Sequence, residues 1–72
     1  MTSLRALHVS LNGEPREIPD GLTLGRLVAT LTTARAGVAA AVNETVIPRS
    51  RWHDTLLSTG DRIEVLTAVQ GG

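Results

Sequence analysis

The stretch that decides the fold is Leu22-Thr23-Leu24-Gly25-Arg26-Leu27-Val28-Ala29-Thr30-Leu31. Its apolar residues at positions 24, 27, 28 and 31 repeat with helical spacing, which predicts one amphipathic helix with a single apolar face. Thr23 stands at the N-cap position, where its hydroxyl can accept a hydrogen bond from a backbone N–H of the first turn. Leu22 and Leu27 occupy the two positions of a hydrophobic staple. We expect the helix to end at Thr32-Thr33.

The residues before the helix predict a β-hairpin. Apolar and polar side chains alternate from Leu4 to Leu11, which is typical of a half-buried strand and places His8 on the solvent face. Asn12-Gly13 follows and is the strongest short signal for a hairpin turn. Residues 16–18 then return as a short antiparallel partner, and Pro19-Asp20-Gly21 has the chemistry of a turn.

The residues after the helix predict further strands. Residues 37–42 contain alternating valines and small alanines, and we expect a strand that is buried on both faces. Asn43-Glu44 predicts a turn. Residues 45–47 form a short return strand in this interpretation, ended by Pro48 because proline has no N–H to donate.

The region that follows predicts a brief turn and a loop. Ser50 is expected to cap a turn that carries Trp52, the only aromatic residue of the chain. Leu56 and Leu57 are expected to fill the bottom of the core. Residues 58–61 read as a loop that leads into the final strand.

The order of these elements predicts an α+β fold. A hairpin, a crossover helix and further strands, the last from Arg62 to Ala68, place one main helix across one face of a mixed sheet of four or five strands. This is the ubiquitin-like β-grasp arrangement, in which the final strand lies beside the first in the interior of the sheet. We therefore expect one domain over residues 1–68 and a flexible C-terminal tail over residues 69–72.

Composition excludes several classes of function. The chain has 72 residues with seven acidic and seven basic side chains, so no net charge attracts nucleic acid or an anionic membrane. It has no cysteine, and His8 and His53 lack ligand spacing, so we expect no metal site. No Gly-rich phosphate loop is present, and we expect no bound cofactor. The apolar runs are too short for a membrane span and no signal peptide is evident, which predicts a cytoplasmic protein.

The tail Val69-Gln70-Gly71-Gly72 contains the one group left for covalent chemistry, the α-carboxylate of Gly72. An α-carboxylate has a pKa of about 3.3–3.7, so it is ionised and a poor electrophile until a partner attaches a leaving group such as adenylate from ATP. Glycines lack Cβ, so Gly71 and Gly72 can lie extended in a narrow slot of that partner.

The final strand suggests where a partner binds. Glu64, Leu66 and Ala68 share one face of this strand, opposite the face of Ile63 and Val65. Leu66 is a large apolar residue on a face whose other residues point to solvent. We predict that Leu66, Ala68 and Glu64 form a partner-binding surface beside the tail.

Six segments together form a pattern that covers nearly the whole chain. They are Asn12-Gly13-Glu14, Thr23-Leu24, Ala41-Val42-Asn43, Val46-Ile47-Pro48-Arg49-Ser50 with Trp52, Gly60-Asp61-Arg62-Ile63-Glu64-Val65, and Ala68-Val69-Gln70-Gly71-Gly72. The pattern resembles the sulfur-carrier proteins of thiamin biosynthesis, the ThiS type.

The resemblance implies a β-grasp carrier that acts as a protein co-substrate and is not itself an enzyme. It implies that an E1-like adenylating enzyme uses ATP to activate the Gly72 carboxylate. A cysteine desulfurase then supplies sulfur to make a C-terminal thiocarboxylate, and thiazole synthase receives that sulfur for the thiazole moiety of thiamin.

Two other classes of protein stay open at this point. One is the small subunit of molybdopterin synthase, whose relatives usually have an aromatic residue or proline just before the glycines, where this chain has Ala68-Val69-Gln70. The other is a ubiquitin-like modifier, whose terminal glycine forms an isopeptide bond with a lysine of its target.

Overall fold

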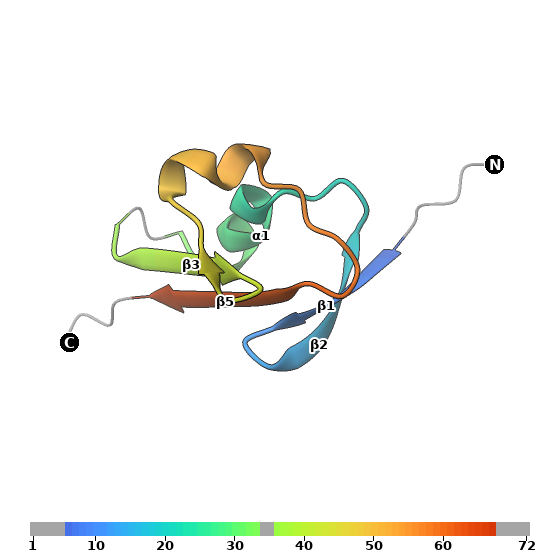
Figure 1. The fold of residues 1–72 in the computed structure, drawn as a ribbon. Helices are drawn as coiled ribbons and strands as arrows, with labels where there is room; N and C mark the ends of the chain where they lie inside the picture. The colour runs from blue at the N-terminus through green and yellow to red at the C-terminus, as the bar shows by residue number, and fades with distance from the viewer. Residues whose placement is uncertain (1–5, 34–35, 68–72) are drawn as a thin grey trace.

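A five-stranded mixed sheet carries one α-helix on one of its faces (Figure 1). The computed structural model describes residues 6–33 and 36–67, and the strands lie in the order β2-β1-β5-β3-β4. The elements are β1 (Ala6–Leu11), β2 (Glu14–Pro19), α1 (Leu24–Leu31), β3 (Val38–Val42), β4 (Thr45–Val46), the 3₁₀-helix η1 (Arg49–Asp54) and β5 (Arg62–Thr67). The predicted ubiquitin-like β-grasp class is confirmed.

The helix α1 forms where the sequence predicts it. The Thr23 hydroxyl accepts a hydrogen bond from the Arg26 backbone N–H at 3.2 Å, as expected for an N-cap. Leu24, Leu27 and Val28 are buried against the sheet, whereas Leu31, in the final turn, is 38% exposed. The helix ends there because the next residue has extended backbone angles.

The N-terminal hairpin has a two-residue turn at Asn12-Gly13. Both residues have positive φ, 52° at Asn12 and 84° at Gly13, which is the geometry that asparagine and glycine tolerate in tight hairpins. The turn pairs the whole of β2 with β1, from Leu11↔Glu14 to Ala6↔Pro19. The return strand is therefore longer than the predicted residues 16–18.

The strand β3 corrects one prediction. It begins at Val38, and its side chains alternate, with Ala40 buried and Ala39 exposed. The prediction that both faces of this strand are buried is wrong, because α1 covers only one face of the sheet (Figure 1). The following strand β4 has two residues only, and Ile47 beyond it donates its N–H to the Ala40 carbonyl at 2.9 Å.

The 3₁₀-helix η1 corrects a second prediction, because Ser50 is not its cap. The residue at the N-cap position is Pro48, no side chain caps the helix, and the Arg51 N–H donates to the Pro48 carbonyl at 2.8 Å. Trp52 is buried and donates its indole N–H to the Ile47 carbonyl at 2.8 Å.

The close contact between η1 and α1 depends on a glycine. A Cβ on Gly25 of α1 would lie 3.4 Å from the Trp52 carbonyl oxygen, which is the edge of ordinary van der Waals contact. The missing side chain lets the backbone of η1 approach the first turn of α1.

The leucine pair beyond η1 is divided between core and surface. Leu57 is buried as predicted, but Leu56 is 66% exposed, so its predicted place in the core is wrong. The segment is extended and forms an isolated antiparallel bridge between Thr23 and Leu56. Successive side chains of an extended segment point to opposite sides, and only one of the two can reach the core.

The strand β5 lies in the middle of the sheet, parallel to β1 and antiparallel to β3, which confirms the predicted position of the last strand. Its predicted final residue, Ala68, lies outside the described residues. The core residues come from every layer of the fold: Val9, Leu11, Ile18, Leu24, Leu27, Val28, Ala40, Trp52, Leu57, Ile63 and Val65.

Candidate functional site

The strand that leads toward the predicted tail has two chemically different faces. Ile63 and Val65 point to the helix and are 1% and 7% exposed. Glu64 and Leu66 point to the opposite, open face of the sheet, where Leu66 is 68% exposed. The predicted division of this strand into a buried face and an exposed face is confirmed for these four residues. Backbone pairing with β3 continues to Thr67, so β5 is held to its last described residue.

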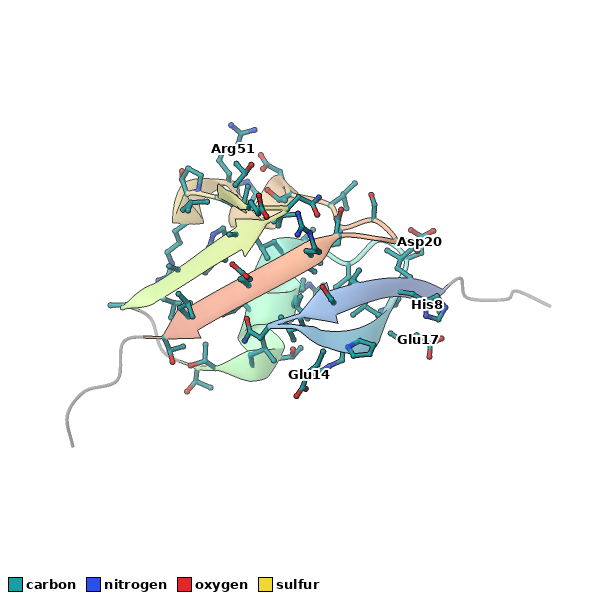
Figure 2. The ribbon with its side chains drawn as sticks, turned by 60° about the horizontal axis from the view of Figure 1, so that its bottom comes forward. His8, Glu14, Glu17, Asp20 and Arg51 are labelled. Atoms are coloured by element: carbon teal, nitrogen blue, oxygen red, sulfur yellow. The ribbon has the colours of Figure 1, made fainter. Side chains whose placement is uncertain are left out.

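Leu66 belongs to a small apolar area that we call the open-face patch and define by Ala39, Ala41, Val46 and Leu66. Ala39 lies opposite Leu66 in the β3–β5 ladder, and Ala41 lies opposite Val46 in the β3–β4 ladder. With Ala40 and Glu64, these residues line a hollow of about 130 Å³. Figure 2 shows this face turned toward the viewer, with the helix behind the sheet.

Clustered exposed apolar side chains are typical of interaction sites. Leu66 and Val46 are 68% and 71% exposed, and they stand on either side of small alanines that leave the hollow between them. The open-face patch is therefore a candidate site for a partner, beside the end of β5.

The sequence prediction missed Val46 and the two alanines of this patch. A two-residue strand such as β4 is too short for alternation to indicate which way Val46 points. The alanines were assigned to the core because small apolar residues fit either environment. The strand register, Ala41↔Val46 and Ala39↔Leu66, is the observation that brings the three residues beside Leu66.

The hairpin half of the open face mixes polar and charged side chains with Ala6, Pro15 and Pro19. His8 of β1 lies opposite Glu17 of β2, and both are exposed on the hairpin side of the sheet (Figure 2). At the start of β5, the Arg62 guanidinium lies 3.3 Å from the Glu44 carboxylate, but both side chains are mostly exposed, so this ion pair adds little stability. The hollow of the open-face patch lies on β5, β3 and β4.

A second hollow, of about 290 Å³, lies between α1 and η1. There the Arg49 guanidinium lies over the Trp52 ring, 5.4 Å from its centroid, while Trp52 itself belongs to the core. The Pro48-Arg49-Ser50-x-Trp52 stretch singled out in the sequence therefore has a structural role. It packs η1 against the helix.

The described residues offer no metal site of the usual kind, since they contain no group of three or more His, Cys, Asp or Glu side chains placed to hold an ion. Among the helices in residues 6–33 and 36–67, none is long and apolar enough to cross a membrane.

The predicted residues of the tail, Val69, Gln70, Gly71 and Gly72, lie outside the described residues, as does the predicted contact residue Ala68. Their roles stay predictions. Of the predicted partner-binding residues, Glu64 and Leu66 are those that the structure places, and both are exposed on the open face.

A family model settles what kind of chain this is. The model described as the ThiS family matches residues 9–72, which include most of the hairpin, the helix, all later strands and the glycine pair. The chain belongs to the ThiS family.

Individual ThiS proteins are similar over nearly the whole chain. The sulfur carrier protein ThiS of Thermus thermophilus is 38% identical over 64 residues, covering 89% of this chain and 98% of its own length. The crystal structure of the thiamine biosynthesis protein (ThiS) from Geobacter metallireducens has 30% identity and a TM-score of 0.72, and covers 92% of this chain and 100% of that chain.

A larger protein contains a segment like this chain. A thiazole synthase of Magnetococcus marinus is 35% identical over 66 residues, which cover 92% of this chain but only 20% of that protein.

Proposed function

We propose that this protein is a sulfur carrier of thiamin biosynthesis that carries sulfur on the carboxyl group of Gly72. The observation that carries the proposal is the ThiS family match through residue 72, on a chain whose central strand leads from the open-face patch toward that residue. The chain itself acts as a protein co-substrate.

The chemistry takes place on the carboxylate of Gly72 and needs ATP from a partner. An oxygen of the carboxylate attacks the α-phosphorus of ATP on an E1-like adenylating enzyme, and pyrophosphate leaves. The terminal sulfur of a persulfide that a cysteine desulfurase supplies then attacks the acyl adenylate, and AMP leaves. A thiol reduces the resulting acyl disulfide to give the thiocarboxylate and a disulfide. We propose the cytoplasm as the compartment of this chemistry, and its supply of ATP is compatible with that location.

The side chains of this protein provide recognition. Leu66 and Val46 of the open-face patch bury apolar surface against the adenylating enzyme, and Glu64 borders that contact. Ala68, Val69 and Gln70 lead the glycines into the active site of the partner. Gly71 and Gly72 pass where a side chain would not fit.

Thiazole synthase is the proposed acceptor of the sulfur. The Magnetococcus marinus protein with that name includes a segment similar to this chain, which supports a direct transfer between a domain of this kind and the synthase. The released carboxylate can then be adenylated again.

The test is alkylation of protein co-expressed with its adenylating enzyme and a cysteine desulfurase. A thiocarboxylate reacts with iodoacetamide, and the chain has no cysteine to give a competing product. No lysine or arginine follows Arg62, so the last tryptic peptide covers residues 63–72 and reports the C-terminus alone. We expect alkylation in this peptide, and none in protein expressed without the two enzymes.

Total mass is not a sufficient measurement, because oxidation of Met1 adds nearly the same mass as replacement of oxygen by sulfur. A co-expressed protein that is never alkylated in the last peptide contradicts the carrier function. Adducts with lysines of other proteins would indicate a modifier, and a constant large partner would indicate a synthase subunit.

A further inference from the structure

The central strand β5 loses its backbone partner on one side before it ends. Its parallel pairing with β1 has two residue pairs, Ser10↔Arg62 and Leu11↔Ile63. After Leu11, β1 enters the hairpin turn and leaves the sheet, whereas β5 continues to Thr67. The backbone N–H and carbonyl groups of Val65 and Thr67 are also directed to the β1 side of β5. They therefore lie beyond the end of this ladder.

The side chain of Asn12 takes the place of the missing strand. Its Oδ1 accepts a hydrogen bond from the Val65 N–H at 2.9 Å, and its Nδ2 donates to the Val65 carbonyl at 3.2 Å. The backbone N–H of Asn12 also donates to the Ile63 carbonyl at 2.8 Å. One turn residue thus extends the pairing of β5 from Ile63 to Val65, across 53 positions of the chain.

The left-handed backbone of Asn12 aims its side chain at this edge. Its φ of 52° is a conformation that asparagine adopts more readily than most residues. A side chain with both a donor and an acceptor is required to bind both backbone groups of Val65. A hairpin turn alone does not require the amide, since glycine also accepts this φ.

Asn43 provides an internal comparison on the opposite edge of β5. It also has a φ of 52°, and its side chain accepts from the Arg62 N–H at 2.9 Å and donates to the Asp61 carboxylate at 2.9 Å. Asn43 therefore holds the start of β5. Asn12 holds the part of the strand that is nearest the tail.

We propose that Asn12 is a positioning residue for the activation of Gly72. By binding Val65, its side-chain amide fixes the line on which β5 leaves the sheet, and so brings the terminal carboxyl group to the nucleotide of the adenylating enzyme in a reactive orientation. Without the amide, the N–H and carbonyl of Val65 on this edge are bonded by water, and the end of β5 is held by β3 alone and opens more readily. This inference rests on the proposed function.

The test compares Asn12→Gly with Asn43→Gly. Both substitutions remove an amide side chain from a residue with the same φ, and glycine accepts that φ without strain. Amide hydrogen exchange in the isolated protein measures the contact itself. We expect exchange at the Val65 N–H to rise about tenfold in Asn12→Gly, from the loss of two hydrogen bonds, with the matching rise at the Arg62 N–H in Asn43→Gly.

Steady-state adenylation by the partner, followed as ATP–pyrophosphate exchange, measures the consequence. At a temperature where both variants are folded, we expect kcat to fall about tenfold in Asn12→Gly, because the carboxyl group of Gly72 is misaligned with the α-phosphorus of ATP. KM should stay within about twofold, because the open-face patch is intact. For Asn43→Gly we expect kcat within about twofold of wild type.

The split between kcat and KM separates positioning from lost stability. A variant that is only partly folded contains less active carrier, which raises its apparent KM and leaves kcat at saturation unchanged. An unchanged Val65 exchange rate, a wild-type kcat in Asn12→Gly, or an equal fall in both variants would each overturn the inference. A wild-type protein that is never adenylated would instead overturn the proposed function.

Discussion

The two faces of β5 have different roles, one in stability and the other in binding. On the covered face, Ile63 and Val65 are almost fully buried and join the hairpin half of the core to the second half. On the open face, Glu64 and Leu66 meet solvent. The difference shows that one strand can contribute strongly to stability with one set of side chains and still present a binding surface with the next.

A second comparison concerns two leucines that are equally exposed but have different surroundings. Leu56 and Leu66 are 66% and 68% exposed, so burial alone does not distinguish them. Leu56 forms the isolated bridge with Thr23, whereas Leu66 lies among the apolar residues of the open-face patch. An isolated exposed leucine is common and carries no function by itself. Its surroundings make Leu66 the candidate.

The largest effect is expected on the covered face. Ile63→Ala should lower the free energy of unfolding by about 2–5 kcal/mol, because it removes a side chain that is 1% exposed and leaves a cavity. Leu66→Ala, on the other face of the same strand, should change it by less than about 0.5 kcal/mol. Urea denaturation measures both. Equal losses would mean that the two faces do not differ in stability as we describe.

The tail should show the opposite behaviour, a loss of activation without a loss of stability. Gly71→Ala keeps the charge, the length and the terminal glycine, and adds one methyl group that must fit the slot of the partner. A displacement of the acyl carbon near 1 Å can cost about a hundredfold in rate, and we expect adenylation to fall at least tenfold. The melting temperature should not change.

A tag appended after Gly72 is the negative control for Gly71→Ala. It places the reactive group in a peptide bond, so adenylation should be lost completely. If Gly71→Ala is instead adenylated at the wild-type rate, the shape of the tail is irrelevant and only a free carboxylate is needed.

The two leucines give the next largest effect. Leu66→Arg should weaken binding to the adenylating enzyme about tenfold, because a charge that must be desolvated opposes an apolar contact. Leu56→Arg is the matched control and should bind as wild type does. Binding is measured by titration calorimetry, with circular dichroism to verify folding. A folded Leu66→Arg that binds normally would reduce this residue to an ordinary surface leucine.

The smallest effect is expected at the rim of the open-face patch. Val46→Ser removes apolar surface from β4 on a side chain that is 71% exposed, so stability should change by less than about 0.5 kcal/mol. Affinity for the adenylating enzyme should fall about two- to threefold, since most contacts around a central residue contribute little. If Val46→Ser binds the adenylating enzyme with wild-type affinity, the binding surface includes only the residues of β5 and β3.

Local signals in the sequence predicted the elements of the fold well. The Asn12-Gly13 turn, the Thr23 cap and the spacing of Leu24, Leu27 and Val28 each depend on residues within one turn of one another. Such patterns predict both the type of secondary structure and the face of it that is buried. The exposed position of Leu66 followed from alternation in the same way.

The features that the sequence did not predict depend on contacts between distant segments. The side-chain bonds of Asn12 to Val65 span 53 positions, and no local pattern indicates them. Ala39 and Val46 became neighbours of Leu66 only through the pairing of three strands. Leu56 was misassigned because two adjacent leucines fit the core equally well by composition, while the backbone direction allows only one.

The position of β5 in the sheet also controls when the protein can fold. This central strand is the last of the described elements to be synthesised, and it alone joins the β2–β1 pair to the β3–β4 pair. A chain that stops before Arg62 lacks Ile63 and Val65, and it exposes the unpaired edges of β1 and β3, which invite aggregation. Chains that stop before Arg62 therefore cannot occupy the partner as folded decoys. Every folded copy has been synthesised at least as far as the strand from which the tail continues.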